Sequence, residues 1–236
     1  MAQVSSVSTA LRAMGHALLD LLFPLRCIGC GKEGSLLCPD CCQSMLRIEE
    51  PFCHRCGKPL HTGESHSHIA GLNIDGIRSV FYYEGITREA ILAFKYKNLK
   101  AMGAPLGRFL AEKLSELPAC DAIVPVPLHY RRLRQRGYNQ SSLLAREVAR
   151  VSGLALVEDS LVRQRNTPPQ ARSSSSEERQ ANVADAFACR DRQLQGKRVI
   201  ILDDVFTTGA TLSACAAAVK AAGAASVWGL TVAAEV

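Results

Sequence analysis

The sequence lacks an uninterrupted hydrophobic run, which argues against a membrane-spanning protein. Its most apolar N-terminal stretch, residues 10–25, contains Arg12, His16 and Asp20, and no small-residue cleavage site follows it. A membrane span needs about 20 consecutive apolar residues, and a signal peptide needs an apolar core followed by such a cleavage site. We therefore expect a cytoplasmic protein in which this stretch forms an amphipathic helix, either packed on the following domain or docked on a partner.

A second absence excludes a common class of nucleotide-binding enzyme. A P-loop nucleoside-triphosphatase needs the pattern Gly-x-x-x-x-Gly-Lys followed by Ser or Thr. The Gly-Lys pairs of this chain begin at Gly31, Gly57 and Gly196, and none of them completes that pattern. Strong compositional bias is also missing, because 47% of the residues are hydrophobic and 21% are charged. This composition excludes a fibre and a disordered chain, and the net charge of +6 is compatible with nucleic-acid binding without requiring it.

Cysteine, by contrast, is abundant and clustered. Seven of the ten cysteines lie between Cys27 and Cys56, mostly in Cys-x-x-Cys pairs. In a chain without an export signal this spacing favours metal binding over disulfide bonds. Two of the pairs are followed by glycine, which permits the tight turn of a zinc knuckle, where backbone amides donate hydrogen bonds to thiolate sulfur.

The first two pairs predict a complete zinc site. Cys27, Cys30, Cys38 and Cys41 can close a tetrahedral site, with Cys42 as the alternative to Cys41. A site closed by four protein ligands is structural, because no position stays open for water or substrate. We therefore expect this zinc to hold the N-terminal segment together rather than to take part in catalysis.

The third pair predicts half of another zinc site. Cys53 and Cys56 have no further cysteine pair to join them, but several histidines follow in the next residues. His66 and His68 are the candidate ligands that would complete a site of two cysteines and two histidines. The alternative is that these histidines lie in a solvated loop rich in Gly, Ser and His.

A different pattern occupies residues 199–212, where four aliphatic residues are followed by Asp203 and Asp204 and then by a loop of small residues. The aliphatic run predicts a buried strand of a parallel sheet, and such sheets bind ligands at the carboxyl ends of their strands. Gly209 lets the backbone approach a ligand closely, and residues 211–222 have the composition of a helix. Helix N-termini attract anions, so we expect a phosphate at this turn.

The rest of the sequence alternates between strand and helix patterns, which is typical of an α/β fold with a parallel sheet flanked by helices. The predicted strands are residues 77–83, 123–127, 155–161, 186–189, 199–202 and 226–233, and the predicted helices are residues 86–96, 104–117, 140–151 and 211–222. We expect two domains: residues 1–72, with the N-terminal helix and the knuckles, and residues 73–236, with the sheet.

A basic segment, residues 129–140, follows the strand that begins at Ile123, and it contains four arginines and no acid. Two interpretations stay open. The segment is a solvated basic surface, or it binds an anion such as pyrophosphate or a nucleic-acid backbone, because it lies at the same sheet edge as Asp203. Two tyrosines add faces on which bases could stack. The residues concerned are Arg131, Arg132, Arg134, Arg136, Tyr130 and Tyr138.

Residues 199–212 resemble the 5-phosphoribosyl-1-pyrophosphate (PRPP) loop of the type I phosphoribosyltransferases. From about residue 21 to the C-terminus, the chain resembles the ComF/GntX family, which joins a zinc-binding segment to a phosphoribosyltransferase-like domain. Besides the knuckles and the PRPP-like loop, the motifs that carry this resemblance are Tyr82-Tyr83-Glu84-Gly85, Phe94-Lys95-Tyr96, Val124-Pro125-Val126-Pro127, Arg136-Gly137-Tyr138-Asn139-Gln140, Arg163-x-Arg165-x-Thr167-x-x-Gln170 and Arg179-x-x-Asn182. One departure concerns the second metal site: the family often has a fourth Cys-x-x-Cys where this chain has His66-Ser67-His68.

The resemblance implies roles for particular residues. The two acids, Asp203 and Asp204, would bind ribose hydroxyls, magnesium would accompany PRPP, and the loop would wrap the 5'-phosphate with Thr207, Thr208, Gly209, Ala210 and Thr211. The polar segment of residues 163–182 has little to bury and is typical of a flexible loop. It is either an idle linker or the mobile lid that the type I transferases close over the diphosphate. The candidate lid residues are Arg163, Arg165, Gln170 and Arg179.

Two functions follow as hypotheses. The first is an enzyme that transfers a ribose 5-phosphate unit from PRPP to an acceptor, although the sequence shows no acceptor-base pocket. The second is a non-catalytic module that uses the same fold to handle single-stranded nucleic acid. Several family members are linked to natural transformation, so the resemblance also implies a set of partners: single-stranded DNA, a competence helicase or other DNA-uptake proteins.

Overall fold

The structure is a computed structural model that describes residues 24–53, 55–60, 71–164 and 186–235. The chain forms two compact units, Met1–Ser44 and Met45–Val236. A domain boundary after residue 72 stays a prediction. The amphipathic helix expected in residues 10–25 lies almost entirely outside the described residues. None of the helices that are described has the length and apolar character needed to cross a membrane.

The first unit is small and is built around the first zinc knuckle. Cys27 N donates a hydrogen bond to Lys32 O, and Gly31 N donates to Cys27 O, so the chain reverses tightly between them. A short helix, α2 (Pro39–Gln43), then begins with proline in its first turn, where the missing amide hydrogen costs nothing. Its one buried residue is Cys41.

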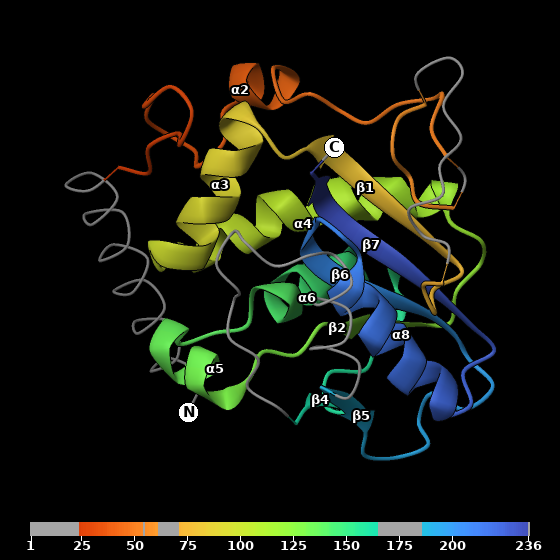
Figure 1. The fold of residues 1–236 in the computed structure, drawn as a ribbon. Helices are drawn as coiled ribbons and strands as arrows, with labels where there is room; N and C mark the ends of the chain where they lie inside the picture. The colour runs from red at the N-terminus through yellow and green to blue at the C-terminus, as the bar shows by residue number, and fades with distance from the viewer. Residues whose placement is uncertain (1–23, 54, 61–70, 165–185, 236) are drawn as a thin grey trace, which may run out of the picture. The chain divides into compact units, whose positions relative to one another are not determined.

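The second unit contains a five-stranded parallel sheet with the order β1-β7-β6-β2-β3 (Figure 1). The strands are β1 (Gly76–Tyr82), β2 (Ala122–Pro125), β3 (Ala155–Leu156), β6 (Arg198–Phe206) and β7 (Ser226–Ala234). The aliphatic residues 199–202 of the central strand β6 are all buried, because helices cover both faces of the sheet. The expected α/β fold is confirmed.

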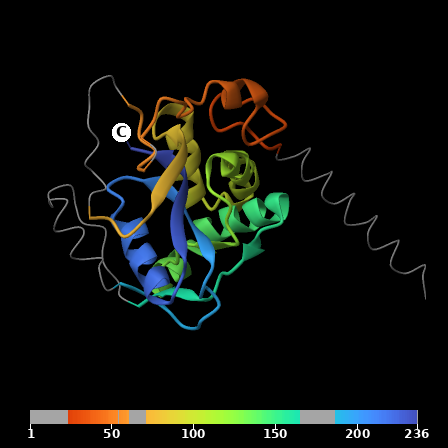
Figure 2. The ribbon, with the colours of Figure 1, turned by 90° about the vertical axis from the view of Figure 1, so that its right-hand side faces the viewer.

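The helices pack on the sheet through apolar residues at helical spacing. Figure 2 shows α8 (Ala210–Ala221) on one face, and α4 (Gly103–Glu112) and α6 (Gln140–Ser152) on the other. Leu106 and Leu110 of α4 are fully buried, as are Leu144 and Val148 of α6. The other helices in the described part of the second unit are α3 (Gly85–Tyr96), α5 (Tyr130–Arg136) and the short 3₁₀ turns η1 (Lys100–Met102) and η2 (Lys113–Glu116).

Two sequence-based expectations about secondary structure were wrong. Residues 186–189 were expected in the parallel sheet, but they form β5 (Phe187–Cys189), which pairs with β4 (Leu161–Arg163) in a separate antiparallel sheet. A short apolar run predicts a strand but not its partner, which tertiary contacts decide. Residues 130–136, where the sequence predicted no helix, form the helix α5: His129 caps its start, and Gly137 ends it in the left-handed conformation.

The order of the strands creates a crevice at one point of the sheet edge. β2 and β6 are neighbours, but the chain continues from β2 to β3 on one side and from β6 to β7 on the other. In open α/β sheets ligands bind outside the carboxyl ends of two strands that diverge in this way. The segments that follow β2 and β6 are the helix α5 and the small-residue loop, so both meet at this crevice.

Candidate functional site

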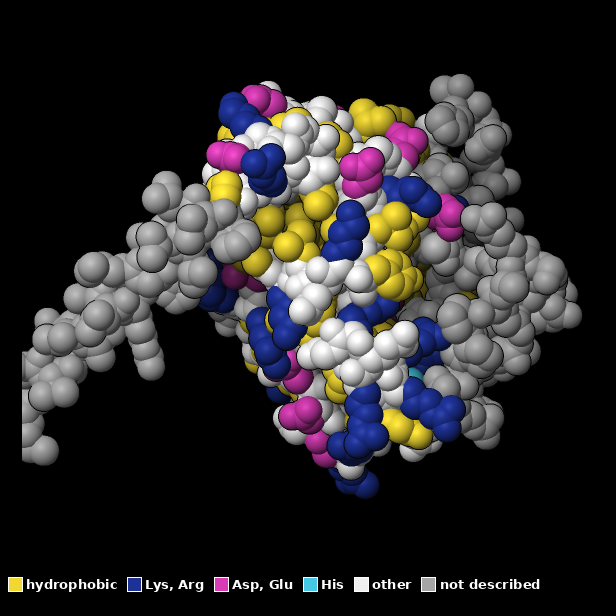
Figure 3. Space-filling view, turned by 90° about the vertical axis from the view of Figure 1, so that its left-hand side faces the viewer, with side chains coloured by type: hydrophobic (Ala, Val, Ile, Leu, Met, Phe, Trp, Pro, Cys, Tyr) yellow, Lys and Arg dark blue, Asp and Glu magenta, His cyan; other side chains and the backbone are white. Residues whose placement is uncertain are grey.

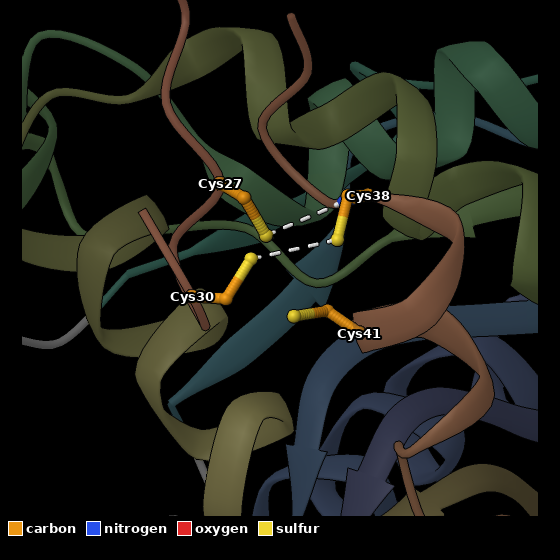
Figure 4. A group of neighbouring side chains, drawn as sticks. All are labelled: Cys27, Cys30, Cys38 and Cys41. Carbon is orange, nitrogen blue, oxygen red and sulfur yellow. Dashed lines mark hydrogen bonds between the residues drawn. The ribbon is translucent and has the colours of Figure 1, made fainter. Parts of the chain in front are cut away.

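The four cysteines of the first knuckle form a compact sulfur cluster (Figure 4). The sulfur atoms of Cys27, Cys30, Cys38 and Cys41 all lie within 4.8 Å of one another. Cys38 N donates a hydrogen bond to Cys27 Sγ at 3.3 Å. Burial opposes ionisation of Cys27, but hydrogen bonds from backbone amides outweigh it and lower its pKa to about 6. Four thiolates at this spacing are the donor set that zinc prefers, and the cluster contains Cys41 rather than Cys42.

The second knuckle repeats the turn of the first. Cys53 N donates to Lys58 O and Gly57 N donates to Cys53 O, each at 2.8 Å, as in the first knuckle. This turn packs directly on β1, where Ile77 N donates to Arg55 O at 2.7 Å. His66 and His68 lie outside the described residues, so completion of a second zinc site stays a prediction.

The acid pair lies at the carboxyl end of β6, and different elements hold the two carboxylates. Ser141 Oγ, at the start of α6, donates to Asp203 Oδ1 at 2.9 Å, and Asp204 N donates to the same oxygen at 2.9 Å. Lys95 Nζ, in the last turn of α3, lies 2.7 Å from Asp204 Oδ1. Burial and the neighbouring carboxylate of Asp204 raise the pKa of Asp203 to about 7, although Lys95 and the two hydrogen bonds oppose this.

The loop after the acids leads into the N-terminus of α8. Gly209 is the residue before the helix, and its φ of 79° is left-handed, which glycine adopts without strain. A Cβ at this position would lie 2.8 Å from Leu72 Cδ1 and 2.9 Å from Phe206 Cε2, so a larger residue fits only if these side chains shift. The exposed Thr207 and the half-buried Thr208 and Thr211 surround this turn. The loop therefore offers hydroxyl groups and the first amides of a helix to an anion.

A cavity of about 870 Å³ lies where these segments meet. Its lining brings together the acid pair, Ser141 and the loop residues Thr207 and Thr211. It is also strongly cationic, because six basic side chains contribute to the wall. The charged residues that line it are Lys95, Lys100, Arg132, Arg134, Arg136, Arg163, Asp203 and Asp204. Such a site suits a ligand that carries both sugar hydroxyls and several negative charges.

The basic segment contributes unequally to this cavity. Arg132, Arg134 and Arg136 line it, whereas Arg131 is exposed and donates to the hydroxyl of Tyr130. Viewed from the side on which α5 lies, the surface shows Lys and Arg side chains gathered in groups (Figure 3). Arg136 Nη1 donates to Gln140 Oε1 at 2.6 Å, which fixes its direction.

The two tyrosines of this segment differ sharply. Tyr130 is 58% exposed, although its ring contacts the ring of His129 and lies near the guanidinium of Arg131. Tyr138 is only 7% exposed, packs on the ring of Phe94 and donates a hydrogen bond to Phe94 O. Tyr138 therefore fastens α3 to the start of α6 and does not offer a stacking face, contrary to the expectation from sequence.

Among the candidate lid residues, Arg163 is placed by the structure, whereas Arg165, Gln170 and Arg179 lie outside the described residues. Arg163 ends β4, lies over the ring of Phe187 and lines the cavity. Burial, together with the positive charge of Arg132, lowers its pKa. Arg163 therefore belongs to the fixed wall of the cavity, next to the arginines of α5.

Two residues of the site were not predicted from the sequence as site residues. Lys95 comes from a helix far from the acids in the sequence, and Ser141 looks like an ordinary first-turn helix residue. The signal for Lys95 was its place in the motif Phe94-Lys95-Tyr96. Its pairing with Asp204 depends on how α3 packs, which residue spacing does not reveal.

The fold and the site together define a phosphoribosyltransferase-like α/β protein that carries a zinc ribbon. Residues 18–70 match the double zinc ribbon domain, and residues 133–235 match the phosphoribosyl transferase domain. The first match and the four-cysteine cluster together assign a structural zinc to the first knuckle.

Comparison with individual proteins identifies the family. Competence protein F of Haemophilus influenzae is 30% identical over 227 residues, which are 88% of this chain and 97% of that protein. DNA utilization protein YhgH of Escherichia coli is 30% identical over 199 residues, 79% of this chain and 85% of that protein. A solved adenine phosphoribosyltransferase from Leishmania tarentolae aligns with 61% of this chain and 75% of that chain, with 15% identity and a TM-score of 0.39. This chain belongs to the ComF/GntX family.

Proposed function

We propose that the second unit binds PRPP, or a related ribose 5-phosphate ligand, in the cavity at the carboxyl ends of β2 and β6. The observation that carries this proposal is the acid pair at the end of β6, followed directly by the turn into α8. Two carboxylates accept hydrogen bonds from neighbouring sugar hydroxyls, and the turn offers amides to a phosphate. The arginines of α5 and Arg163 would then face a diphosphate group on the other side of the cavity.

If the protein is a transferase, these residues supply most of what the reaction needs. Departure of pyrophosphate from the C1 carbon leaves positive charge on the ribose and negative charge on the leaving group. Arg132, Arg134 and Arg163 lie where they could stabilise that leaving group, and the cavity wall excludes part of the solvent. Magnesium, when bound with PRPP, would neutralise part of the diphosphate charge.

Ligand titration tests the site directly. Replacing Asp203 and Asp204 by Asn should weaken PRPP binding by two orders of magnitude or more, since each charge-assisted hydrogen bond contributes about 1.5–3 kcal/mol. Asp159→Asn is a suitable control, because Asp159 is an exposed acid that does not line the cavity. Calorimetry that finds equal PRPP affinity in the double variant and in the control would refute this assignment.

The proposed ligand contact also predicts a pH dependence. Only the carboxylate form of Asp203 can accept hydrogen bonds from two donors at each oxygen, and its pKa is about 7. Affinity for ribose 5-phosphate should therefore fall as the pH is lowered from about 8 to about 6, because protons compete with the sugar. The phosphate group of the ligand also titrates near pH 6. The pH dependence measured with Asp203→Asn is therefore subtracted from that of the unmodified protein.

Whether transfer occurs requires a reaction assay. The protein would be incubated with PRPP, magnesium and a panel of bases and nucleic acids, and pyrophosphate release would be followed. Release that depends on one acceptor class, and that is lost in the Asp203 and Asp204 double variant, would establish a transferase. Binding of PRPP without release under any of these conditions would favour a non-catalytic role.

A second candidate function is the handling of single-stranded DNA, which the names of the relatives suggest: they are a competence protein and a DNA utilization protein. The structural observation in its favour is the outer side of α5, where Arg131 and the exposed ring of Tyr130 lie next to each other. Arginine with an exposed aromatic ring is a common binding surface for single strands. A competence helicase or another DNA-uptake protein would then be a natural partner.

The salt dependence of binding tests this second function. If all four arginines of α5 contact phosphates, log affinity should fall with log salt at a slope of roughly −3, at about 0.7 per contact. Replacing Arg131 and Arg134 by Ala should flatten that slope for every sequence alike, because phosphate contacts carry no sequence information. An unchanged slope would place the nucleic-acid surface elsewhere.

A further inference from the structure

The ion pair between Lys95 and Asp204 lies inside the proposed ligand site. Lys95 Nζ is 2.7 Å from Asp204 Oδ1, and the two side chains are only 20% and 11% exposed. Both residues line the cavity that also contains Asp203. A buried ammonium and a buried carboxylate each need a partner, and here each supplies the partner of the other.

The backbone that carries this ammonium is held in place. Lys95 belongs to the last turn of α3, whose buried residues include Ala90, Ile91 and Phe94. Phe94 O accepts hydrogen bonds from the hydroxyl of Tyr138 and from Gln140 Nε2, so the end of α3 is fastened to the start of α6. The packing of α3 therefore places the base of the Lys95 side chain beside the acid pair, and the ion pair with Asp204 holds its ammonium there.

Charge at the acid pair decides what else can bind there. Two adjacent carboxylates without a counter-charge repel each other, and they either bind a divalent cation or take up a proton. Lys95 places one positive charge in hydrogen-bonding contact with Asp204. It is also close enough to Asp203 to oppose the rise that burial and Asp204 cause in the pKa of Asp203. The acid pair thus already has a cation, and its remaining acceptor positions face the cavity.

Resting on the proposed ribose 5-phosphate site, we propose that Lys95 takes the place of a divalent cation at the acid pair, so that sugar hydroxyls bind Asp203 and Asp204 without a metal ion. The ligand class is a phosphorylated pentose with two neighbouring hydroxyls. A metal ion that accompanies a diphosphate then serves the diphosphate alone. Lys95 is a positioning residue: its contact with Asp204 Oδ1 orients that carboxylate as an acceptor.

Ribose 5-phosphate is the probe that isolates this effect, because it has the sugar hydroxyls but no diphosphate to bind magnesium. Calorimetry on the full, zinc-loaded chain should give affinities that agree within about threefold in a buffer with magnesium and in a magnesium-free buffer without a chelator, which leaves the structural zinc in place. In Lys95→Met the affinity measured in the magnesium-free buffer should fall about tenfold or more, the effect expected for one charge-assisted hydrogen bond. Magnesium should restore part of the loss in Lys95→Met, because the uncompensated carboxylates can then bind the metal.

Two controls separate positioning from a general loss of structure. Lys95→Arg keeps a cation at the acid pair and should retain binding in the magnesium-free buffer. Lys97→Met makes the same change at an exposed position just after α3 and should leave the affinity unchanged. 2-Deoxyribose 5-phosphate lacks one of the two hydroxyls and should bind the unmodified protein more weakly, which checks that the acid pair is the contact.

The outcomes distinguish this proposal from the function on which it rests. Binding of ribose 5-phosphate by the unmodified protein in magnesium but not in the magnesium-free buffer would overturn the role of Lys95 and leave the site intact. Equal affinity of Lys95→Met and the unmodified protein in the magnesium-free buffer would also overturn it. If the unmodified protein does not bind ribose 5-phosphate in either buffer, the proposed ligand itself is wrong.

Discussion

The two zinc knuckles have the same backbone turn but different support. In each, the first cysteine and the glycine close the turn with the same two backbone hydrogen bonds. Among the described residues, no heavy atom lies within 4 Å of the place where a Cβ on Gly31 would be. At Gly57, the equivalent atom would lie 2.6 Å from the backbone oxygen of Ile77. The first knuckle is held by its sulfur cluster, and the second is packed on β1.

This difference shows what a metal and a hydrophobic core each contribute. Cys56 of the second knuckle is part of the core cluster of the second unit, together with Phe52 and Ile77. A unit as small as the first cannot bury enough apolar surface to fold on its own, so its stability depends on zinc. We therefore expect the first knuckle to respond to loss of metal ligands and the second to respond to changes in packing.

The largest effect should follow loss of a cysteine from the first cluster. Cys38→Ser removes one of four ligands, and structural zinc contributes an apparent binding free energy of about 10–16 kcal/mol in zinc-finger peptides. Hydrogen exchange at the amides of Cys27, Ile28 and Gly31, all of which donate hydrogen bonds in the structure, should become fast. Cys42→Ser, outside the cluster, is the matched control, and unfolding in both variants would contradict the assignment of Cys41.

The second largest effect should follow a glycine substitution in the second knuckle. Gly57→Ala introduces a left-handed alanine, which costs about 1–2 kcal/mol, and drives its Cβ against the rigid backbone of Ile77. Overpacking of this kind adds about 1–3 kcal/mol. Denaturant unfolding, followed by the fluorescence of Trp228, the single tryptophan of the chain, should show the loss. An unchanged midpoint would mean that the second knuckle is not part of the core.

Gly209, which is also left-handed, extends the comparison to the ligand site. In Gly209→Ala the atoms nearest to the new Cβ belong to Leu72 and Phe206, whose side chains can shift. The loss of stability should therefore be nearer 2 kcal/mol than 4, at about the cost of the left-handed backbone. The effect on ligand binding should be larger, because the turn that faces the phosphate changes shape. Calorimetry should show that the affinity for ribose 5-phosphate falls about tenfold or more. The midpoint of denaturant unfolding should shift less than in Gly57→Ala.

The smallest effect is expected at Gly31. Gly31→Ala meets no neighbouring atom among the described residues, so only the left-handed backbone conformation opposes it, at about 1–2 kcal/mol. The zinc content should stay the same as in the unmodified protein. A loss of zinc in this variant would show that the turn itself, and not only the four sulfur atoms, is needed to hold the metal.

Sequence alone determined the parts of this protein that depend on residues close together in the chain. The spacing of Cys27, Cys30, Cys38 and Cys41 predicted the first zinc site, because ligands so near in sequence can meet in few ways. The aliphatic run before Asp203 and Asp204 predicted the central strand, because both faces of that strand are buried. The ten-cysteine composition and these motifs together were enough to suggest the family.

Only the tertiary structure decided which of several equivalent residues belong to each site. In the folded chain Cys41, and not Cys42, belongs to the sulfur cluster. Tyr138 is buried whereas Tyr130 is exposed, and β4 pairs with β5. The tertiary structure also brought Lys95 to Asp204, although α3 and β6 are far apart in the sequence. Local patterns specify the period and burial of an element, whereas contacts between distant elements depend on how whole helices and strands pack, which no short stretch of sequence contains.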